Sequence, residues 1–297
     1  MNMKRKRLFR MVPFVLFVAG VCAGAYLVYN RGCSSPLPTK QTFYEGVVYR
    51  RMVSVVPRPM IAHIITIDRR TADIAFLVTP PDREGDLPLD ARTTSRFLDE
   101  FNVQIAVNGD GFEPWWSRSP VDYYPHEGDP VVTLGFTASN GVIYSQGRSN
   151  DQWIEPTLYI TRTNYPSFSR RRPDRVWSAI SGDRMLVNGG QVESGLDDKI
   201  LEPRTAIGIS GNGRFVYLVV VDGRQPFCSE GATFRELAQI LLDHGAFFAM
   251  SLDGGGSSTM VIEGESGEPV VLNSPIDNYI PGRERPVANH LGIYVYP

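Results

Sequence analysis

Short apolar runs separated by glycine- and proline-rich turns make up most of the chain. This pattern predicts a strand-rich globular body over residues 46–297, with no internal repeat. A brief helix is expected near 94–101. Runs with the length and β-branched content that are typical of strands lie at 47–56, 60–68, 74–79 and 103–107.

One stretch of the body, 215–252, has the pattern of a strand, a helix and a second strand. The apolar run 215–221 ends at Asp222, a capping box at Thr233 begins a helix, and a second apolar run, 246–252, ends at Asp253. Because such a unit normally joins parallel strands, both aspartates are expected at one edge of the sheet, where ligands bind in α/β folds. We therefore predict an α+β fold with a mixed β-sheet core and a βαβ crossover.

The first 45 residues have a different character. Five Lys and Arg residues and no acid precede the uncharged run 11–29, which is just long enough to cross a bilayer, and only Arg31 follows it closely. Residues 1–30 are thus expected to form a basic cytoplasmic stub and a single transmembrane anchor, followed by a linker over 31–45 and an extracytoplasmic domain over 46–297. The alternative is a signal peptide cleaved near Ala23, which would make the domain secreted.

Charge and cysteine content narrow the choice of partners and compartment. The chain has 30 Lys and Arg against 32 Asp and Glu, and five of the basic residues lie in the N-terminal segment, so the body is acidic. An acidic body argues against nucleic-acid binding, which needs a basic face. Outside the cytoplasm, Cys33 and Cys228 would be able to form a disulfide.

Acidic and glycine-rich turns follow three of the predicted strands. After Asp253, the loop Gly254, Gly255, Gly256, Ser257 and Ser258 is expected to form an anion-binding nest of backbone N–H groups. Arg204 and Arg224 carry guanidinium forks that suit bidentate contacts with phosphate. Asn108 and Asp110 lie in a similar glycine-rich turn, which follows the predicted strand 103–107. The alternatives are ordinary hairpin turns for the loops and surface ion pairs for the arginines.

Several familiar sites are missing from the sequence. It contains no Gly-x-Ser-x-Gly elbow, no phosphate loop ending in Gly-Lys-Ser/Thr and no complete dinucleotide fingerprint. Its four histidines are scattered without the spacing of zinc ligands. No cofactor is required by these patterns, and any metal would be a hard divalent cation on aspartate oxygens.

An ordered set of motifs resembles the phosphodiester glycosidase family. The motifs occupy residues 108–110, 178–189, 203–208, 221–224, 251–261 and 284–289, so that the resemblance covers about 100–297. One departure is Gly111, which separates Asp110 from the bulky aromatics that usually follow directly in the family. The resemblance implies hydrolysis of a sugar-1-phosphodiester at the anomeric carbon, with a glycan or cell-envelope polysaccharide as substrate.

The resemblance and the strand-end pattern together imply roles for particular residues. Asp253 is the first candidate for the catalytic carboxylate because it adjoins the glycine loop, and Asp222 and Asp110 are the others. Trp115 and Trp116 would stack on sugar faces. Substrate-binding residues are expected at Asn108, Arg204, Thr205, Arg224, Gly254, Gly255, Gly256, Ser257, Ser258 and Asn289.

Two other functions remain open from the sequence alone. A non-catalytic, membrane-tethered glycan-binding module would use the aromatic residues but would not need acids at three strand ends. A metal-dependent phosphodiesterase would break the P–O bond instead, although the chain lacks a histidine-rich metal site. The products distinguish the three functions: reducing sugar with phosphomonoester, no turnover, or sugar phosphate.

Overall fold

The computed structural model describes residues 39–147, 155–169 and 171–296, together with Phe17, Ala19, Gly20 and Gly24. The chain divides into two compact units, residues 1–35 and 36–297, and every described strand belongs to the second unit. Most of the predicted anchor at 11–29, the start of the linker and Cys33 lie outside the described residues. Among the residues that are described, no helix is long and apolar enough to cross a membrane.

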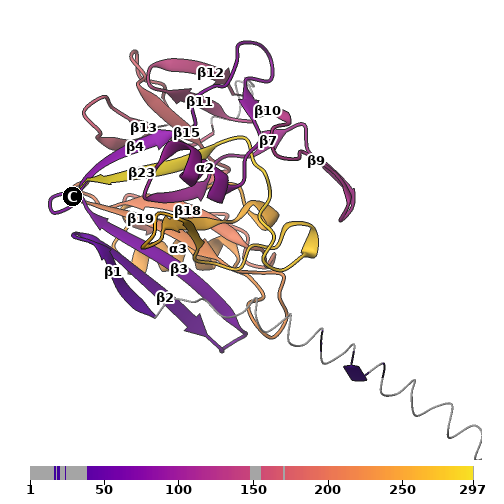
Figure 1. Cartoon of the computed structure of the whole chain (residues 1–297). Helices are drawn as coiled ribbons and strands as arrows, with labels where there is room; N and C mark the ends of the chain where they lie inside the picture. Colours follow the sequence, from indigo (N-terminus) through magenta and orange to yellow (C-terminus); the bar gives the residue numbers. More distant parts are fainter. Residues whose placement is uncertain are drawn as a thin grey trace, which may run out of the picture. The chain divides into compact units, whose positions relative to one another are not determined.

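The largest layer is a sheet of eight strands (Figure 1). Its spatial order is β1 (Lys40–Tyr44), β2 (Val47–Ser54), β3 (Met60–Asp68), β19 (Phe215–Val221), β18 (Arg204–Ile209), β20 (Phe248–Ser251), β16 (Arg184–Asn188) and β17 (Gln191–Val192). Every neighbouring pair in this sheet is antiparallel. The prediction of a mixed sheet was therefore wrong.

Two five-stranded sheets and two smaller ones complete the body. One has the order β22 (Pro269–Val271), β21 (Met260–Glu263), β6 (Ile105–Asn108), β23 (His290–Tyr296), β4 (Asp73–Val78). The other has the order β12 (Val142–Gln146), β11 (Phe136–Ser139), β15 (Ser178–Ser181), β13 (Thr157–Ile160), β14 (Pro166–Ser169). The small sheets are β5 (Leu89–Asp90), β10 (Pro130–Thr133), β7 (Phe112–Glu113) and the hairpin β8 (Trp116–Ser119), β9 (Asp122–Tyr124).

Helices are few in the described residues. They are α2 (Thr94–Phe101), α3 (Phe234–Asp243) and the 3-10 turns η1 (Gly255–Ser257) and η2 (Asp277–Tyr279). The fold is therefore mostly β rather than a balanced α+β architecture. The predicted helix near 94–101 is confirmed, and so is the capping box, in which the side chains of Thr233 and Glu236 each accept from the other's backbone N–H.

The predicted crossover is confirmed, but another strand, β18, lies between the two strands that it joins. Strand β18 is antiparallel to both β19 and β20, so β19 and β20 run in the same direction and α3 connects them. The register pairs Arg204 with Val221 and Ala206 with Ser251. The ends of β19 and β20 and the beginning of β18 thus meet at one edge, which brings Arg204 to the same edge as Asp222 and Asp253.

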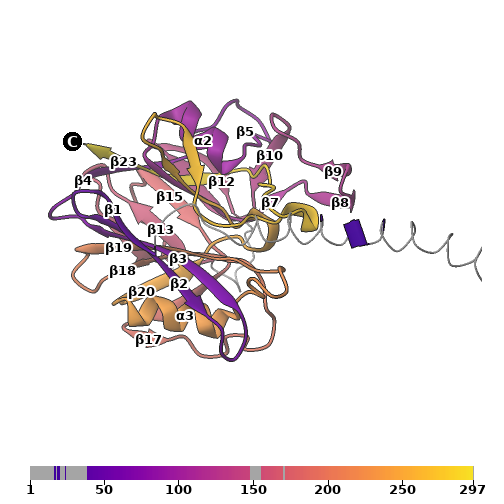
Figure 2. The same ribbon diagram turned by 60° about the horizontal axis from the view of Figure 1, so that its bottom comes forward.

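The two faces of the large sheet pack against different partners. On one face, Ala206 and Val219 lie in a core with Leu237 and Leu241 of α3. On the other face, the alternate residues of the sheet belong to a core that it shares with both five-stranded sheets. This core contains Ile207 of β18, Ile105 of β6 and Leu158 of β13. Figure 2 shows α3 beneath β18 and β20, on the face turned away from β13 and β15. Because both faces of β19 are covered in this way, its sequence is continuously apolar instead of alternating.

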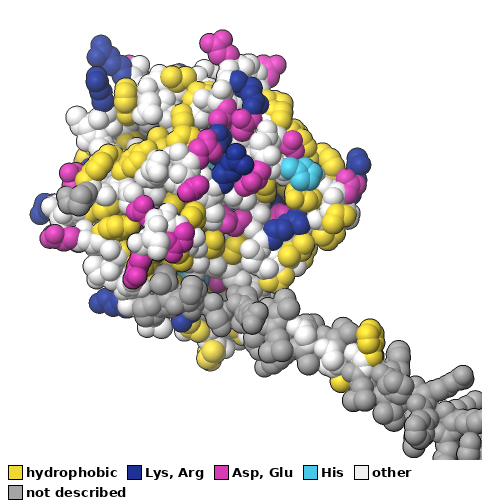
Figure 3. Space-filling model, in the orientation of Figure 1, with side chains coloured by type: hydrophobic (Ala, Val, Ile, Leu, Met, Phe, Trp, Pro, Cys, Tyr) yellow, Lys and Arg dark blue, Asp and Glu magenta, His cyan; other side chains and the backbone are white. Residues whose placement is uncertain are grey.

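Charged side chains of both signs are interspersed on the face of the molecule that Figure 3 displays. Lys and Arg do not gather into one basic patch there. Such a surface agrees with the acidic balance of the body and provides no electrostatic footprint for nucleic acid on this face.

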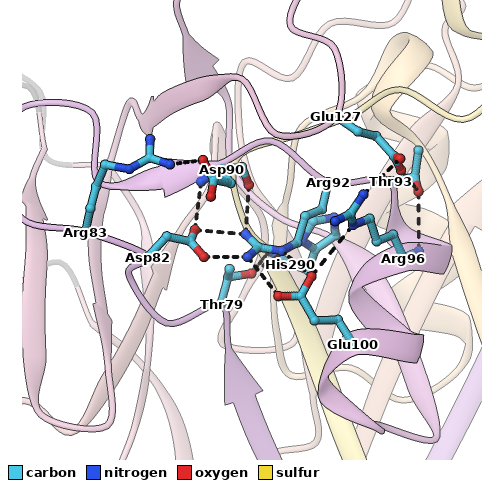
Figure 4. A network of polar contacts seen from close by, with 10 residues as sticks. All are labelled: Thr79, Asp82, Arg83, Asp90, Arg92, Thr93, Arg96, Glu100, Glu127 and His290. Carbon is cyan, nitrogen blue, oxygen red and sulfur yellow. Dashed lines mark hydrogen bonds and ion pairs between the residues drawn. The ribbon is translucent and has the colours of Figure 1, made fainter.

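A buried arginine ties α2 to the loops around it (Figure 4). Arg92 is 5% exposed and donates to the carboxylates of Asp82 and Glu100, with Nε to Glu100 Oε2 at 2.8 Å. Its backbone also exchanges hydrogen bonds with Val287. Because burial of an unpaired guanidinium is costly, this network fixes the position of segment 284–290 relative to α2.

Replacing Arg92 with methionine is expected to lower the free energy of unfolding by about 2–3 kcal/mol, since Asp82 and Glu100 lose their shared cation. The partial exposure of these carboxylates keeps the loss below that of a fully buried pair. Urea unfolding followed by circular dichroism measures the change. Arg96→Met, at a side chain that is 54% exposed, is the matched control and should cost less than about 0.5 kcal/mol. Equal losses would contradict the assignment.

Candidate functional site

A cavity of about 970 Å³ opens at the edge of the large sheet where the crossover strands end. Its lining combines carboxylates, arginines and aromatic rings. The carboxylates are Asp110, Glu155, Asp183, Glu202 and Asp253, the arginines are Arg204, Arg224 and Arg285, and the rings are Phe112, Trp115, Phe234 and Tyr279. The volume is that of a typical small-molecule site.

The buried amide of Asn108 joins the two sheets below this cavity. Its Oδ1 accepts from the hydroxyl of Thr205 at 2.7 Å and from the N–H of Thr259 at 3.1 Å, while its Nδ2 donates to the carbonyl of Asp253 at 2.8 Å. The N–H of Asp253 donates in turn to the carbonyl of Gly109. Asn108 and Thr205 are fully buried, so they hold the site together rather than bind substrate as predicted.

Asp110 follows directly and is fixed by its own set of donors. Its N–H donates to Oδ1 of the buried Asn289 at 2.8 Å, and its carboxylate accepts from the N–H groups of Gly111 at 2.8 Å and Gly135 at 2.7 Å. Asn289 was expected to bind substrate, but it is fully buried and instead positions Asp110. The structure therefore brings Asp110 to the cavity, as predicted, in a fixed orientation.

Asp253 lies beside an arginine that the sequence analysis did not select. The N–H of Gly254 donates to Asp253 Oδ1 at 2.9 Å, and the hydroxyl of Ser257 also hydrogen-bonds to this carboxylate. Arg285 donates to Ser257 Oγ at 3.2 Å, and Asp277 accepts from Arg285 Nε at 2.7 Å. Arg285 stands within the 284–289 motif, and its neighbour Asp277, 1% exposed, orients it toward the glycine loop.

Two of the three glycines make room for guanidinium groups, and a third arginine lies beside the first glycine. A Cβ at Gly255 would lie 2.9 Å from Nη2 of Arg224, and one at Gly256 would lie 2.5 Å from Nη2 of Arg285. At Gly254 the nearest arginine atoms belong to Arg204, at 3.8–3.9 Å. The expected approach of Arg204 and Arg224 to this loop is thus present, and Arg285 joins them.

Arg204 differs from the other two arginines in its partners. Arg224 is paired with Glu202 at 2.5 Å, and Arg285 is paired with Asp277. Arg204 donates to the carbonyls of Ala232 and Ile200 and lies over the ring of Phe234 at 3.7 Å. In the described part of the chain no carboxylate forms an ion pair with Arg204, and Glu202, Asp183 and Asp197 act on its charge only from a longer distance.

The predicted nest of free N–H groups is not what the loop contains. The N–H groups of Gly254, Gly255, Ser257 and Ser258 donate to acceptors in the protein, among them the carbonyl of Pro203 at 2.9 Å from Gly255 N. Because four of the five loop N–H groups already donate to protein acceptors, the loop does not present the expected row of free N–H groups, and the positive character of this wall comes from arginine side chains.

Asp222 reaches the expected edge, but its carboxylate points away from the cavity. It accepts from Ser274 N at 2.7 Å and lies 3.0 Å from His63 Nε2, whose Nδ1 is 2.9 Å from the hydroxyl of Tyr49. Asp222 is 3% exposed and is not among the residues that line the cavity. Its role as a reacting carboxylate is therefore unsupported, because it is occupied in a buried network behind the loop.

The aromatic loop contributes one tryptophan rather than two. Trp115 lines the cavity with the guanidinium of Arg285 over its ring at 4.9 Å, whereas Trp116 lies outside the lining and stacks on Tyr124. Hairpin β8–β9 is attached to η2 by Ser117 Oγ, which lies 2.5 Å from Asn278 Oδ1. Trp115, directly before β8, and Ser117 line the cavity while Trp116 between them does not, as expected where successive side chains of an extended segment alternate.

The electrostatic environments of Asp110 and Asp253 differ. Burial and the nearby carboxylate of Glu155 raise the pKa of Asp110 to about 7. Burial also raises the pKa of Asp253, but the hydroxyl of Ser257 and the charge of Arg285 act in the opposite direction. Two carboxylates held in such different surroundings suit different roles in acid–base chemistry.

Glu155 is a further lining residue that the sequence analysis did not select, as are Asp183 and Glu202. Glu155 precedes β13 in a stretch without a motif or a strand-end glycine turn, and no local signal marks it. Among the described residues, no group of three or more His, Cys, Asp or Glu is arranged to hold a metal ion.

Substituting Gly255 with alanine is expected to weaken the binding of inorganic phosphate about tenfold, because the new Cβ would displace Arg224 and remove one charge-assisted hydrogen bond. Gly267→Ala is the matched control: both glycines have positive φ, +63° and +87°, but nothing lies within 4 Å of a Cβ at Gly267. Both variants should lose similar stability. Isothermal titration calorimetry measures the affinity, and equal affinities would disprove the proposed spacing role.

Comparisons with known proteins identify relatives of this fold. The chain is similar to the catalytic domain of zebrafish N-acetylglucosamine-1-phosphodiester alpha-N-acetylglucosaminidase, auto-inhibited by its pro-peptide, with a TM-score of 0.57, 20% identity and coverage of 88% of this chain and 85% of that one. It is also similar to a hypothetical protein from Synechocystis, with a TM-score of 0.56, 16% identity and coverage of 88% and 64%. These likenesses concern the fold.

A sequence relative is the SPbeta prophage-derived uncharacterized protein YomE of Bacillus subtilis (strain 168). It is 35% identical over 103 residues, which are 35% of this chain and 14% of YomE, so the alignment spans a small part of that protein. The family model described as phosphodiester glycosidase matches residues 101–294, more than half of the chain. The resemblance seen in the motifs is confirmed, and the chain belongs to the phosphodiester glycosidase family.

Proposed function

We propose that this protein hydrolyses a sugar-1-phosphodiester at the anomeric carbon and releases a reducing sugar and a phosphomonoester. The observation that carries the proposal is the convergence of Arg204, Arg224 and Arg285 on the glycine loop, directly beside Asp253. A phosphodiester needs cations at its phosphate and a carboxylate at its anomeric carbon, and this wall of the cavity offers both within one loop.

The phosphate would lie against the arginines. Guanidinium groups form bidentate hydrogen bonds with phosphate oxygens, and among the described residues Arg204 forms no ion pair that a phosphate would have to replace. As the bond to the anomeric carbon breaks, negative charge increases on the leaving phosphate. Cations already in place stabilise that charge without reorganisation during the reaction.

The sugar would lie toward Asp253, Asp110 and Trp115. Carboxylates accept hydrogen bonds from sugar hydroxyls, and the exposed ring of Trp115 provides an apolar face for stacking. The charge of Asp253 interacts with both Arg285 and Asp110. In this place its carboxylate would stabilise the positive charge that develops on the anomeric carbon.

We further propose that the domain works outside the cytoplasm on a glycan or cell-envelope polysaccharide. The basic stub and the apolar run 11–29 support export or anchoring. Cys228 is disulfide-bonded, which fits an oxidising compartment. The other cysteines of the chain, Cys22 and Cys33, are outside the described residues, so the pairing of Cys33 with Cys228 stays a prediction.

Hydrolysis in water enriched in ¹⁸O tests the position of bond cleavage. The full-length protein should convert a panel of sugar-1-phosphodiesters into reducing sugar that contains ¹⁸O and phosphomonoester that does not, because water attacks carbon. Mass spectrometry of both products measures this. Label in the phosphate would indicate a phosphodiesterase that breaks the P–O bond. An absence of turnover across the panel, in protein that still binds the sugars, would favour the glycan-binding alternative.

Asp253→Asn should reduce kcat/KM by about 10²- to 10³-fold, because it keeps the size of the side chain and removes its charge at the reacting carbon. Asp73→Asn, an exposed residue at the start of β4, is the matched control and should retain full activity. Circular dichroism confirms the fold of both variants. An Asp253→Asn enzyme with nearly normal turnover would show that this carboxylate serves only its own turn.

A further inference from the structure

The carboxylates of Glu155 and Asp110 approach each other at the place where Gly135 lacks a side chain. A Cβ added to Gly135 would lie 2.5 Å from both Asp110 Oδ2 and Glu155 Oε2, so these two oxygens are within 5.0 Å of each other. The absence of a side chain at residue 135 is what allows the carboxylates to approach. Both of them line the cavity.

The groups around Asp110 fix the orientation of its carboxylate and raise its pKa. The N–H groups of Gly111 and Gly135 orient it, and the titratable groups that interact with it are Glu155 before β13, Asp253 after β20 and Tyr144 on β12. The first two are acids. Tyr144 donates its hydroxyl to the carbonyl of Thr79 and adds no positive charge. Asp110 is therefore surrounded by negative charge, in contrast to Asp253 with Arg285 beside it.

We propose that Asp110 is the base that takes a proton from the attacking water, and that Glu155 is a positioning residue that keeps Asp110 basic through the repulsion of their charges. This inference rests on the proposed function. It assigns the three cavity carboxylates separate tasks: Asp253 at the anomeric carbon, Asp110 at the water and Glu155 behind Asp110.

The reaction balances with water as the only co-reactant. The water oxygen forms a bond to the anomeric carbon while one of its protons passes to the ionised carboxylate of Asp110. The bond from the anomeric carbon to the phosphate oxygen breaks, and its electron pair leaves with the phosphomonoester on the arginines. The proton on Asp110 then returns to solvent before the next turnover.

The pKa of Asp110, raised to about 7 by burial and then by Glu155, fits this role, since a base works best when its pKa lies near the working pH. Below pH 7 the carboxylate is protonated and cannot accept the proton, so kcat/KM should fall as the pH drops through about 7. Removing the charge of Glu155 lowers the pKa of Asp110. The fall in activity then moves to lower pH, and the weaker base also gives a slower maximum rate.

The test is the pH profile of kcat/KM for the full chain and three variants. Glu155→Gln should move the acidic limb down by about one pH unit or more and reduce the plateau about tenfold. Glu155→Asp keeps the charge and should keep the limb near pH 7. Glu265→Gln, in an exposed turn, is the control for the substitution and should match the parent protein. An unmoved limb in Glu155→Gln would overturn the role of Glu155.

Asp110→Asn tests the base itself and should lose at least about 100-fold in kcat/KM above pH 7, together with the acidic limb near pH 7. Full activity in this variant would overturn the assignment of the base. If the parent protein places ¹⁸O in the phosphate, the proposed function fails instead. The electrostatic coupling is measured without turnover by ¹³C-carboxyl NMR titration of Asp110, where Glu155→Gln should lower its pKa and an unchanged value would contradict the coupling.

Discussion

The arrangement of the site depends on one buried side chain, the amide of Asn108. Strand β6 belongs to a five-stranded sheet, whereas Thr205 and Asp253 belong to the edge of the eight-stranded sheet, and Asn108 hydrogen-bonds to both. A buried amide must satisfy its donors and acceptors, so the two sheets can meet here in few ways. The carboxylates of Asp110 and Asp253 come from different sheets, and their relation follows from this junction.

The glycine loop shows how the absence of side chains can concentrate charge. Three guanidinium groups repel one another, and each needs space and a counter-contact to remain in place. The loop provides the space, while Glu202, Asp277 and the ring of Phe234 provide the contacts. The result is a cavity lined by these arginines and by the carboxylates of Asp253, Asp110 and Glu155, a combination of charges that matches a substrate with an anionic half and a hydroxyl-rich half.

Segment 284–290 connects the site to the rest of the body through successive residues. Glu284 accepts from the N–H of Ser95 at the start of α2, Arg285 enters the cavity, and Val287 pairs with Arg92 of the network in Figure 4. Asn289 then holds Asp110. His290 ends the segment in a fully buried position, stacked on Phe97, where burial lowers its pKa to about 3 and keeps it neutral. A stable α2 region therefore supports the geometry of the cavity around the glycine loop.

The sequence by itself determined the strands, the helix cap, the crossover, the family and the presence of Asp110, Asp253, Arg204 and Arg224 at one site. Each of these depends on periodicity, on capping within a few residues or on an ordered set of motifs. The tertiary structure alone decided that β18 lies between β19 and β20, that Asp222 turns toward His63, that four of the five loop N–H groups are already used and that Glu155 reaches Asp110. These outcomes depend on contacts between residues far apart in the chain, such as Asp222 with His63, 159 positions away. Local patterns place a side chain on a strand end, but only the packing of distant segments decides which way it faces and what charge lies beside it.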